Sequence, residues 1–174
     1  MQYLAAIFGN FTLSWDLGII VFLYLAAFFY GLSAGQRRLS LLLLSVYLSF
    51  VLISIAPYFD NYISEMPEYQ RFVIESILFI ALVIGIFFVI SGSILYSSLN
   101  LPKKEEGQLW HLPLLSIVTV GFLISSILAF APDLYYNNLS TITAEVFVFN
   151  SAHFWWALAG IATFVTLKVT KKNS

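Results

Sequence analysis

The sequence predicts an all-α polytopic integral membrane protein, a bundle of five transmembrane helices. Three observations predict this class: 60% of the 174 residues are hydrophobic, only 10% are charged, and the charges leave five long gaps. Soluble domains are about 45–50% apolar and about 25% charged. A chain of 19.6 kDa cannot hide so much apolar surface inside a globule. The composition therefore excludes a soluble enzyme, and the absence of cysteine excludes disulfides and thiolate sites.

The uncharged stretches cover residues 17–36, 39–59, 76–102, 107–132 and 146–167. Crossing the hydrocarbon core takes roughly 20 apolar residues, and backbone groups in lipid must be paired within a helix. We therefore expect one membrane domain over residues 1–174. Its expected helices cover about 16–35, 39–57, 72–98, 111–131 and 146–167.

Residues that start or stop helices bound each stretch. Asp16 lies in the first turn of the first helix, where a carboxylate suits the helix dipole. The turn from Gly35 to Arg38 is so short that the first two helices must form a tight antiparallel hairpin. Pro57 stops the second helix, and Pro67 precedes the third. The third helix exceeds the bilayer thickness, so we expect it to be tilted or partly interfacial.

The fourth and fifth helices follow a short charged loop. Pro113 lies in the first turn of the fourth helix, where proline is tolerated, and Pro132 follows its end. We expect residues 133–145 to form an outer loop. His153 then lies about seven residues inside the fifth helix, about 10 Å deep at about 1.5 Å per residue.

The positive charges orient the chain in the membrane. With five helices, seven of the eight basic residues fall on one face: Arg37, Arg38, Lys103, Lys104, Lys168, Lys171 and Lys172. Only Arg71 falls on the other face. The positive-inside rule makes the face with seven charges cytoplasmic. We therefore expect the N-terminus outside and the C-terminus inside.

Small residues recur at intervals of four and are candidates for close helix packing. They are Ala27, Gly31 and Gly35 in the first helix, Ser45 and Ser49 in the second, and Gly121, Ser125 and Ala129 in the fourth. Small residues let helix backbones approach closely in lipid. Two alternatives remain: packing within the chain, or packing against another copy or a partner protein.

Five polar residues are candidates for a site in the outer half of the membrane: Asp16, Arg71, Glu75, Asn150 and His153. Glu75 follows Arg71 by four residues, which allows an ion pair at the headgroups or, alternatively, a proton or cation site. His153 shares a helix face with Asn150. It either bonds to a neighbouring helix or takes part in a proton relay with Glu75 or Asp16. With two histidines on opposite sides of the membrane, we expect no metal site, and we expect no catalytic residue and no cofactor.

Residues 15–45 read Trp-Asp-Leu-Gly-Ile-Ile, an apolar run, Gly31-x-x-x-Gly35, Arg37-Arg38 and a Leu-rich sequence to Ser45. This stretch resembles the opening hairpin of the colicin V production protein (CvpA-like) family. The resemblance implies the topology of that hairpin and a bacterial inner-membrane protein with a role in secretion and envelope homeostasis. It assigns no role to a side chain. The Gly-rich stretch that the family carries before its last helix is missing around residues 100–113.

The minimal loops and small-residue stripes favour a non-enzymatic membrane subunit or scaffold. We expect the lipid bilayer as its surroundings, itself or other membrane proteins as partners, and no nucleic acid, since the net charge is −1. The alternative is a small transporter, channel or proton-coupled unit that uses Glu75 and His153. An intramembrane enzyme would need Glu75, His153 and Asp16 to converge within hydrogen-bond reach.

Overall fold

The computed structural model describes residues 15–56, 65–92, 111–136, 139–148 and 151–172, and within these ranges its regular structure is entirely helical. Four helices are long and apolar enough to cross a membrane. Two helices that are bent relative to each other take the place of the expected fifth helix. If this pair crosses the membrane as one broken span, the described residues contain five spans. The all-α membrane class that the sequence predicts is confirmed.

The first two helices form the expected hairpin. Helix α2 covers Trp15–Ala34 and α3 covers Gln36–Ser54, so Gly35 alone separates them. Gly35 has a φ of 87°, which residues with a Cβ rarely adopt. Packing of Gly35 against another helix of this chain is not found, because no described atom lies within 4 Å of the position of a Cβ there. Packing against another copy or a partner stays a prediction. Within this chain it is the turn that requires the glycine.

Helix α5 covers Glu68–Gly92 and α7 covers His111–Leu128. At about 1.5 Å per residue, α5 is about 37 Å long, against about 30 Å for the hydrocarbon core. Helix α5 is therefore longer than the core is thick, as expected. Its expected continuation to residue 98 lies outside the described residues. Helix α7 ends earlier than expected, and the Ala131 N–H donates to the Leu128 carbonyl at 3.0 Å in the turn before Pro132.

The segment after α7 differs most from the expectation. The expected outer loop contains α8 (Asp133–Tyr136) and most of α9 (Thr141–Phe147). The fifth helix does not begin at residue 146, because α10 covers Ala152–Lys172. Helices α9 and α10 meet at 60°, and Ser151 between them has a φ of 59°. An uncharged stretch shows which residues can lie in hydrocarbon, but not where the backbone bends.

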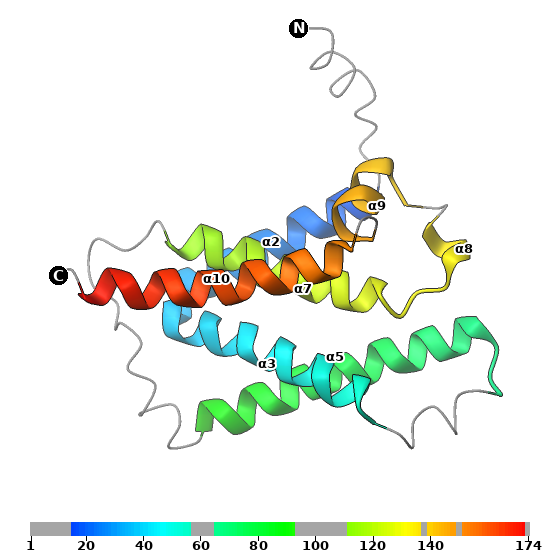
Figure 1. Cartoon of the computed structure of the whole chain (residues 1–174), viewed down its shortest axis with the longest axis horizontal. Coiled ribbons are helices and arrows are strands. Elements are labelled where there is room, and N and C mark those ends of the chain that lie inside the picture. The colour runs from blue at the N-terminus through cyan, green and yellow to red at the C-terminus, as the bar shows by residue number, and fades with distance from the viewer. Residues whose placement is uncertain (1–14, 57–64, 93–110, 137–138, 149–150, 173–174) are drawn as a thin grey trace, which may run out of the picture.

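Helix α7 lies at the centre of the bundle. Helices α2, α3 and α10 pack on α7, and α5 packs mainly on α3. Buried residues make up 56% of the apolar stretch of α7 but only 6% of that of α2. Figure 1 shows the α2–α3 turn, the start of α7 and the ends of α5 and α10 at the left, so the spans alternate in direction.

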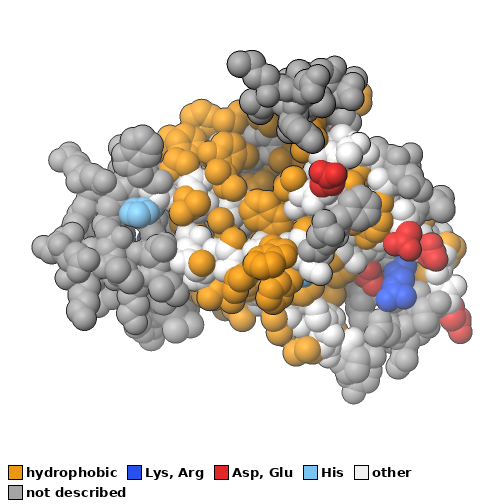
Figure 2. Space-filling model, turned by 45° about the horizontal axis from the view of Figure 1, so that its top comes forward, with side chains coloured by type: hydrophobic (Ala, Val, Ile, Leu, Met, Phe, Trp, Pro, Cys, Tyr) orange, Lys and Arg blue, Asp and Glu red, His pale blue; other side chains and the backbone are white. Residues whose placement is uncertain are grey.

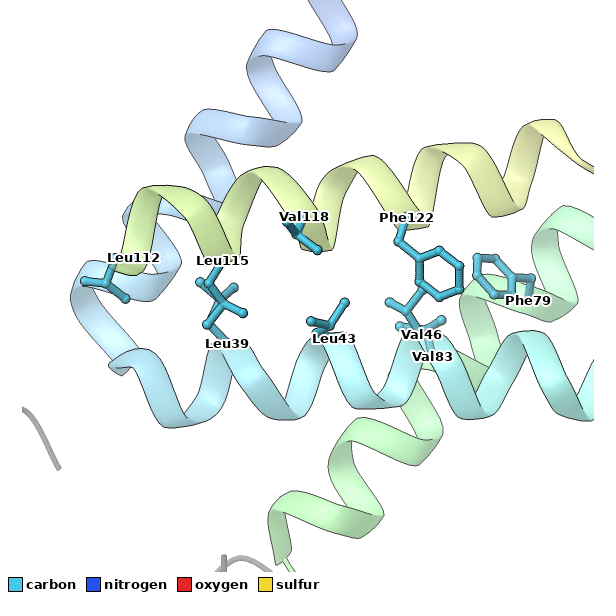
Figure 3. Close-up of a cluster of buried hydrophobic side chains, with 9 residues drawn as sticks. All are labelled: Leu39, Leu43, Val46, Phe79, Val83, Leu112, Leu115, Val118 and Phe122. Atoms are coloured by element: carbon cyan, nitrogen blue, oxygen red, sulfur yellow. The ribbon is translucent and has the colours of Figure 1, made fainter. Parts of the chain in front are cut away.

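The core lies between α3, α5 and α7 (Figure 3). Its buried side chains are Leu39, Leu43 and Val46 from α3, Phe79 and Val83 from α5, and Leu112, Leu115, Val118 and Phe122 from α7. Lipid tails are as apolar as these side chains, so helix association here depends on close packing rather than on escape from water. Figure 3 shows the side chains of α3 and α7 facing one another across this core, with Phe79 beside Phe122.

Buried hydroxyl groups line the same helices, and most of them donate to their own helix. The acceptor is the carbonyl four residues earlier, at 2.7–2.8 Å, for Ser45, Ser49, Ser116, Thr119 and Ser126. A hydroxyl paired in this way needs no partner on another helix. These small side chains therefore let the helices approach without building a polar path between them.

Large apolar side chains remain exposed around the bundle. Among the side chains that are more than half exposed are Trp15, Ile19, Phe22 and Phe29 on α2, and Ile77, Phe88 and Val89 on α5. Figure 2 shows apolar side chains over the middle of one face, with the charged side chains toward the right. A surface of this kind faces lipid rather than water. The structure fits a multi-pass membrane protein.

Candidate functional site

An ion pair lies near the start of α5, at the end of the bundle that the distribution of positive charges predicts to lie outside. Arg71 Nε donates to Glu75 Oε1 at 3.0 Å. Glu75 is only 8% exposed, whereas 45% of the Arg71 side chain is exposed. One helical turn separates the two residues, which suits such a pair. Of the two alternatives above, the structure contains the ion pair.

A cavity of about 370 Å³ opens beside this pair, and we call it the outer cavity. It is lined by Glu68 and Arg71 from α5, Phe130, Ala131 and Pro132 from the segment after α7, and Asp133 from α8. Among the described residues, the outer cavity therefore presents the guanidinium group of Arg71 and the carboxylates of Glu68 and Asp133, beside the ring of Phe130.

Aromatic contacts hold α8 against α5 beside the outer cavity. The ring of Tyr135 lies 6.2 Å from that of Tyr69, nearly parallel to it, and 5.5 Å from that of Phe72. Such pairs add to stability beyond the area they bury. Because α8 carries Asp133, these contacts place that carboxylate opposite the first turns of α5.

Asp16 fixes the start of α9. Its Oδ2 accepts hydrogen bonds from the Ser140 backbone N–H at 2.9 Å and from Ser140 Oγ at 2.8 Å. Ser140 is the N-cap of α9, where its Oγ accepts from the Thr143 N–H. Asp16 therefore joins the N-terminus of α2 to a helix more than 120 residues away along the chain.

His153 lies in the first turn of α10, not seven residues inside a helix, because α10 begins at Ala152. Its ring packs on Phe50 at 4.3 Å and on Phe122 at 5.2 Å between centroids. Phe122 lies about 9 Å before the end of α7, so the imidazole remains below the outer end of the bundle. Among the described residues, its buried Nδ1 has no hydrogen-bond partner. Asn150, its expected neighbour, lies outside the described residues.

Three phenylalanine rings connect the surroundings of Glu75 with His153. Phe79, one turn after Glu75, lies 5.8 Å from Phe130. Phe130 lies 6.2 Å from Phe50, which in turn contacts His153. These rings carry no exchangeable proton, so this chain of contacts cannot serve as a proton relay.

The candidate polar residues thus occupy three separate places. They are the Arg71–Glu75 pair, the contact of Asp16 with Ser140, and His153 between two rings. No group of three His, Asp or Glu side chains in the described part of the chain could hold a metal ion. The geometry therefore does not assemble one polar centre from these groups.

Two of the expected packing glycines lie at close helix approaches. A Cβ on Gly31 would lie 3.0 Å from Leu39 Cδ2. A Cβ on Gly121 would lie within 3.0 Å of three ring carbons of Trp156. Real Cβ atoms essentially never come as close as the contact at Gly121, and the contact at Gly31 is tighter than most, so both positions favour a residue without a side chain.

The other expected packing residues differ in their surroundings. Ser125 is buried and donates to the Phe147 carbonyl at 3.0 Å, which joins α7 to α9. Ala27 is half-buried and packs against a small cluster of buried residues from α7 and α9. Packing of Ala129 against another helix of this chain is a wrong expectation, because Ala129 is exposed and lies beyond the end of α7.

The sequence did not indicate which aromatic residues fill the glycine positions. Trp156 covers Gly121, and the Tyr47 ring covers Gly160 while its hydroxyl donates to the Ala157 carbonyl. An isolated glycine inside an apolar helix is the only sequence signal of such a contact. The partner ring comes from another helix, at a position that spacing along the chain does not reveal.

A second cavity, which we call the apolar groove, has a volume of about 190 Å³. It is lined by Ile20, Val21 and Tyr24 from α2, Ile117, Val120 and Gly121 from α7, Phe147 from α9 and Trp156 from α10. Val21 is 55% exposed, so the groove opens to the surroundings of the bundle. Among the described residues, none forms a hydrogen bond with the Tyr24 hydroxyl.

Comparisons of the chain with protein-family models, curated proteins and solved structures found no match. The resemblance of residues 15–45 to the colicin V production family stays a prediction.

Proposed function

We propose that this chain is a non-enzymatic subunit or scaffold of a membrane assembly, and that it binds another transmembrane helix in the apolar groove beside α2. The observation that carries this proposal is Tyr24, a residue that lines the groove and for whose hydroxyl the described part of the chain offers no hydrogen-bond partner. The partner is either a second copy of the chain or another membrane protein.

The depth of Tyr24 is the first support. Tyr24 lies nine residues after the start of α2, or about 13 Å along the axis, close to the middle of a core about 30 Å thick. A hydroxyl at that depth is costly without an acceptor, and hydrocarbon tails offer none. A second transmembrane helix offers carbonyl and hydroxyl oxygens at that depth.

The shape of α2 is the second support. Only Gly31 of this 20-residue helix is buried in the bundle. The groove runs along its flank and is lined almost entirely by apolar side chains. A helix that fits such a groove gains close contacts of the kind that drive association in lipid.

Site-specific photocrosslinking tests the proposal, and the absence of native cysteine simplifies it. A Val21→Cys variant carries a benzophenone-maleimide label in the groove. The matched control is Ile84→Cys on α5, since these two side chains are 55% and 51% exposed. In native membranes we expect a protein adduct at position 21 well above that at position 84. Lipid adducts alone at both positions would contradict the proposal.

A second variant tests the role of the hydroxyl. Tyr24→Phe keeps the ring and removes only the oxygen. We expect it to reduce the protein adduct of Val21→Cys, because the partner then loses a hydrogen bond made in a low-dielectric medium. Mass spectrometry of the adduct separates a second copy from a different protein. An adduct of unchanged yield would contradict the role of Tyr24.

The alternative, a small transporter, channel or proton-coupled unit, is favoured by one observation, the buried Nδ1 of His153 without a described partner. The ring contacts between Glu75 and His153 oppose a relay between them. Proton flux into liposomes that falls in both Glu75→Gln and His153→Ala would support this alternative. Flux that is absent, or equal in both variants and the parent, would contradict it.

The proposal includes the bacterial inner membrane and a role in envelope homeostasis or secretion. Its support is the resemblance of the first hairpin to the colicin V production family. Fractionation of a bacterial host that expresses the chain checks the location, and recovery outside the inner-membrane fraction would contradict it.

A further inference from the structure

The charges around the outer cavity have a mixed pattern. Arg71 contributes one positive charge, and Glu68 and Asp133 contribute two negative charges around a volume of about 370 Å³. Binding pockets for small molecules begin at about 300 Å³. A simple anion would meet two carboxylates here, and a simple cation would meet a guanidinium. The pattern favours a zwitterion, whose two charges can each face the opposite sign.

Arg71 is held in place for such a contact. The Glu75 carboxylate, itself buried, accepts from Arg71 Nε at 3.0 Å. A guanidinium has five N–H donors in a rigid plane, so the pair with Glu75 orients the plane. With 45% of its side chain exposed, Arg71 is accessible from the cavity. Guanidinium groups bind phosphate through paired hydrogen bonds.

The length of α5 and the tyrosines beside the outer cavity favour a position of this cavity at the depth of lipid headgroups. Helix α5 is about 7 Å longer than the hydrocarbon core, and the charged turn from Glu68 to Arg71 is the end that fits outside that core. Tyr69 and Tyr135 stack beside it, and tyrosines gather at the membrane interface. At that depth a lipid headgroup would reach this cavity from within the membrane.

We propose that the outer cavity binds the phosphoethanolamine headgroup of a phospholipid in the outer leaflet. Arg71 binds the phosphate, and Glu68 and Asp133 accept hydrogen bonds from the primary ammonium group. The ring of Phe130, which also lines the cavity, packs beneath the headgroup. The site is selective because an ethanolamine ammonium donates three hydrogen bonds, whereas the quaternary ammonium of choline donates none.

Titration of the purified full-length chain with short-chain lipids tests this proposal. The probes are dihexanoyl phosphatidylethanolamine, phosphatidylcholine and phosphatidylglycerol, and native mass spectrometry counts the bound lipid. We expect the ethanolamine lipid to bind about tenfold more tightly than either of the others. This is the difference in affinity expected from one hydrogen bond to a charged group, about tenfold. Equal binding of the ethanolamine and choline lipids would overturn the proposal.

Charge-neutral variants locate the site. Glu68→Gln and Asp133→Asn change exposed side chains, so the fold should tolerate them. Each variant should weaken the binding of the ethanolamine lipid about tenfold. Arg71→Lys keeps the charge and loses the paired geometry, so it should also weaken binding. Glu145→Gln is the matched control, since Glu145 is exposed on α9 and does not line the cavity. Losses no greater than that of the control would place the lipid elsewhere and overturn the proposal.

Free glycerophosphoethanolamine, which keeps the phosphodiester and the ammonium group but has no acyl chains, distinguishes the lipid from a soluble zwitterion of the same chemistry. The lipid should bind at least about tenfold more tightly, because its chains also contact the exposed apolar side chains of the bundle. If the soluble compound binds as tightly as the lipid, the lipid is not the ligand of this cavity, and the proposal is overturned.

Discussion

The indole ring of Trp156 lies over Gly121, in the space where any larger residue at position 121 would place its Cβ. The same ring stacks on Phe147 at 5.5 Å, nearly parallel to it, and its Nε1–H donates to the Val146 carbonyl at 2.9 Å. One side chain of α10 thus contacts α7 and α9 together. The bend between α9 and α10 is therefore held by a contact that only glycine permits.

Gly121→Ala should lower the free energy of unfolding by about 1–3 kcal/mol, the usual cost of overpacking a filled interior. Unfolding by denaturant in detergent measures this change. Gly85→Ala on α5 is the control, because nothing lies within 4 Å of its Cβ position; it should leave stability unchanged or slightly higher. Adding Trp156→Ala should remove most of the effect of Gly121→Ala, and purely additive effects would count against this contact.

Gly35→Ala should cost about 1–2 kcal/mol for a different reason. Its φ of 87° is strained for a residue with a Cβ, although no atom is near enough to clash. Gly92→Ala tests the distinction, since Gly92 has equal space and no positive φ. If the two variants unfold alike under the same denaturant gradient, the strain at the hairpin turn is not significant.

Asp16→Ala should release α9 from the start of α2. A hydrogen bond to a carboxylate contributes about 1.5–3 kcal/mol, so the loss of two should cost at least that much, whereas Ser140→Ala should cost about 1 kcal/mol through the lost N-cap. The double variant should cost less than the sum, because both changes remove the same contact. Additive losses in this cycle would show that the two residues are not coupled.

The stability of the bundle should fall at alkaline pH through Tyr136. Its single O–H is shared between the carbonyls of Leu128 and Ala131, which lie 3.0 Å and 2.9 Å from the hydroxyl oxygen. Burial raises the pKa of Tyr136 above the ordinary value of 10.0, and the Asp133 carboxylate raises it further. Because the pKa of Tyr136 is higher in the folded state, the protonated hydroxyl stabilises the folded chain fully below pH 10.0. This stabilisation is lost as the pH rises from 10.0 through the pKa of the folded state. Thermal unfolding between pH 8 and 11 should show a steeper loss for the parent than for Tyr136→Phe.

Reporter fusions should place residue 38 and the C-terminus in the cytoplasm, and residue 66 outside. The structure brings the α2–α3 turn and the end of α10 to the same end of the bundle (Figure 1). Alkaline phosphatase and green fluorescent protein fusions report the two compartments. A fusion at residue 38 that is active outside would reverse the assignment of the outer cavity to the outer leaflet.

The polar candidates show which contacts can be predicted from the spacing of residues along the chain and which cannot. The Arg71–Glu75 pair depends on two residues one turn apart on one helix, so the sequence was sufficient to indicate it. The bond from Ser140 to Asp16 joins residues 124 positions apart, and no local pattern signals it. The outer cavity was missed for the same reason, since its two sides come from α5 and the segment after α7.

The sequence by itself determined the membrane class, four of the spans and the tight first hairpin, because lipid excludes charge and unpaired backbone, and both constraints act along the chain. Only the tertiary structure decided which glycines receive an aromatic ring, where the last span bends, and which polar groups meet. Those outcomes depend on the shapes of the side chains that different helices present to one another. The periodicity of residues within one helix does not reveal the shape of the helix that packs against it.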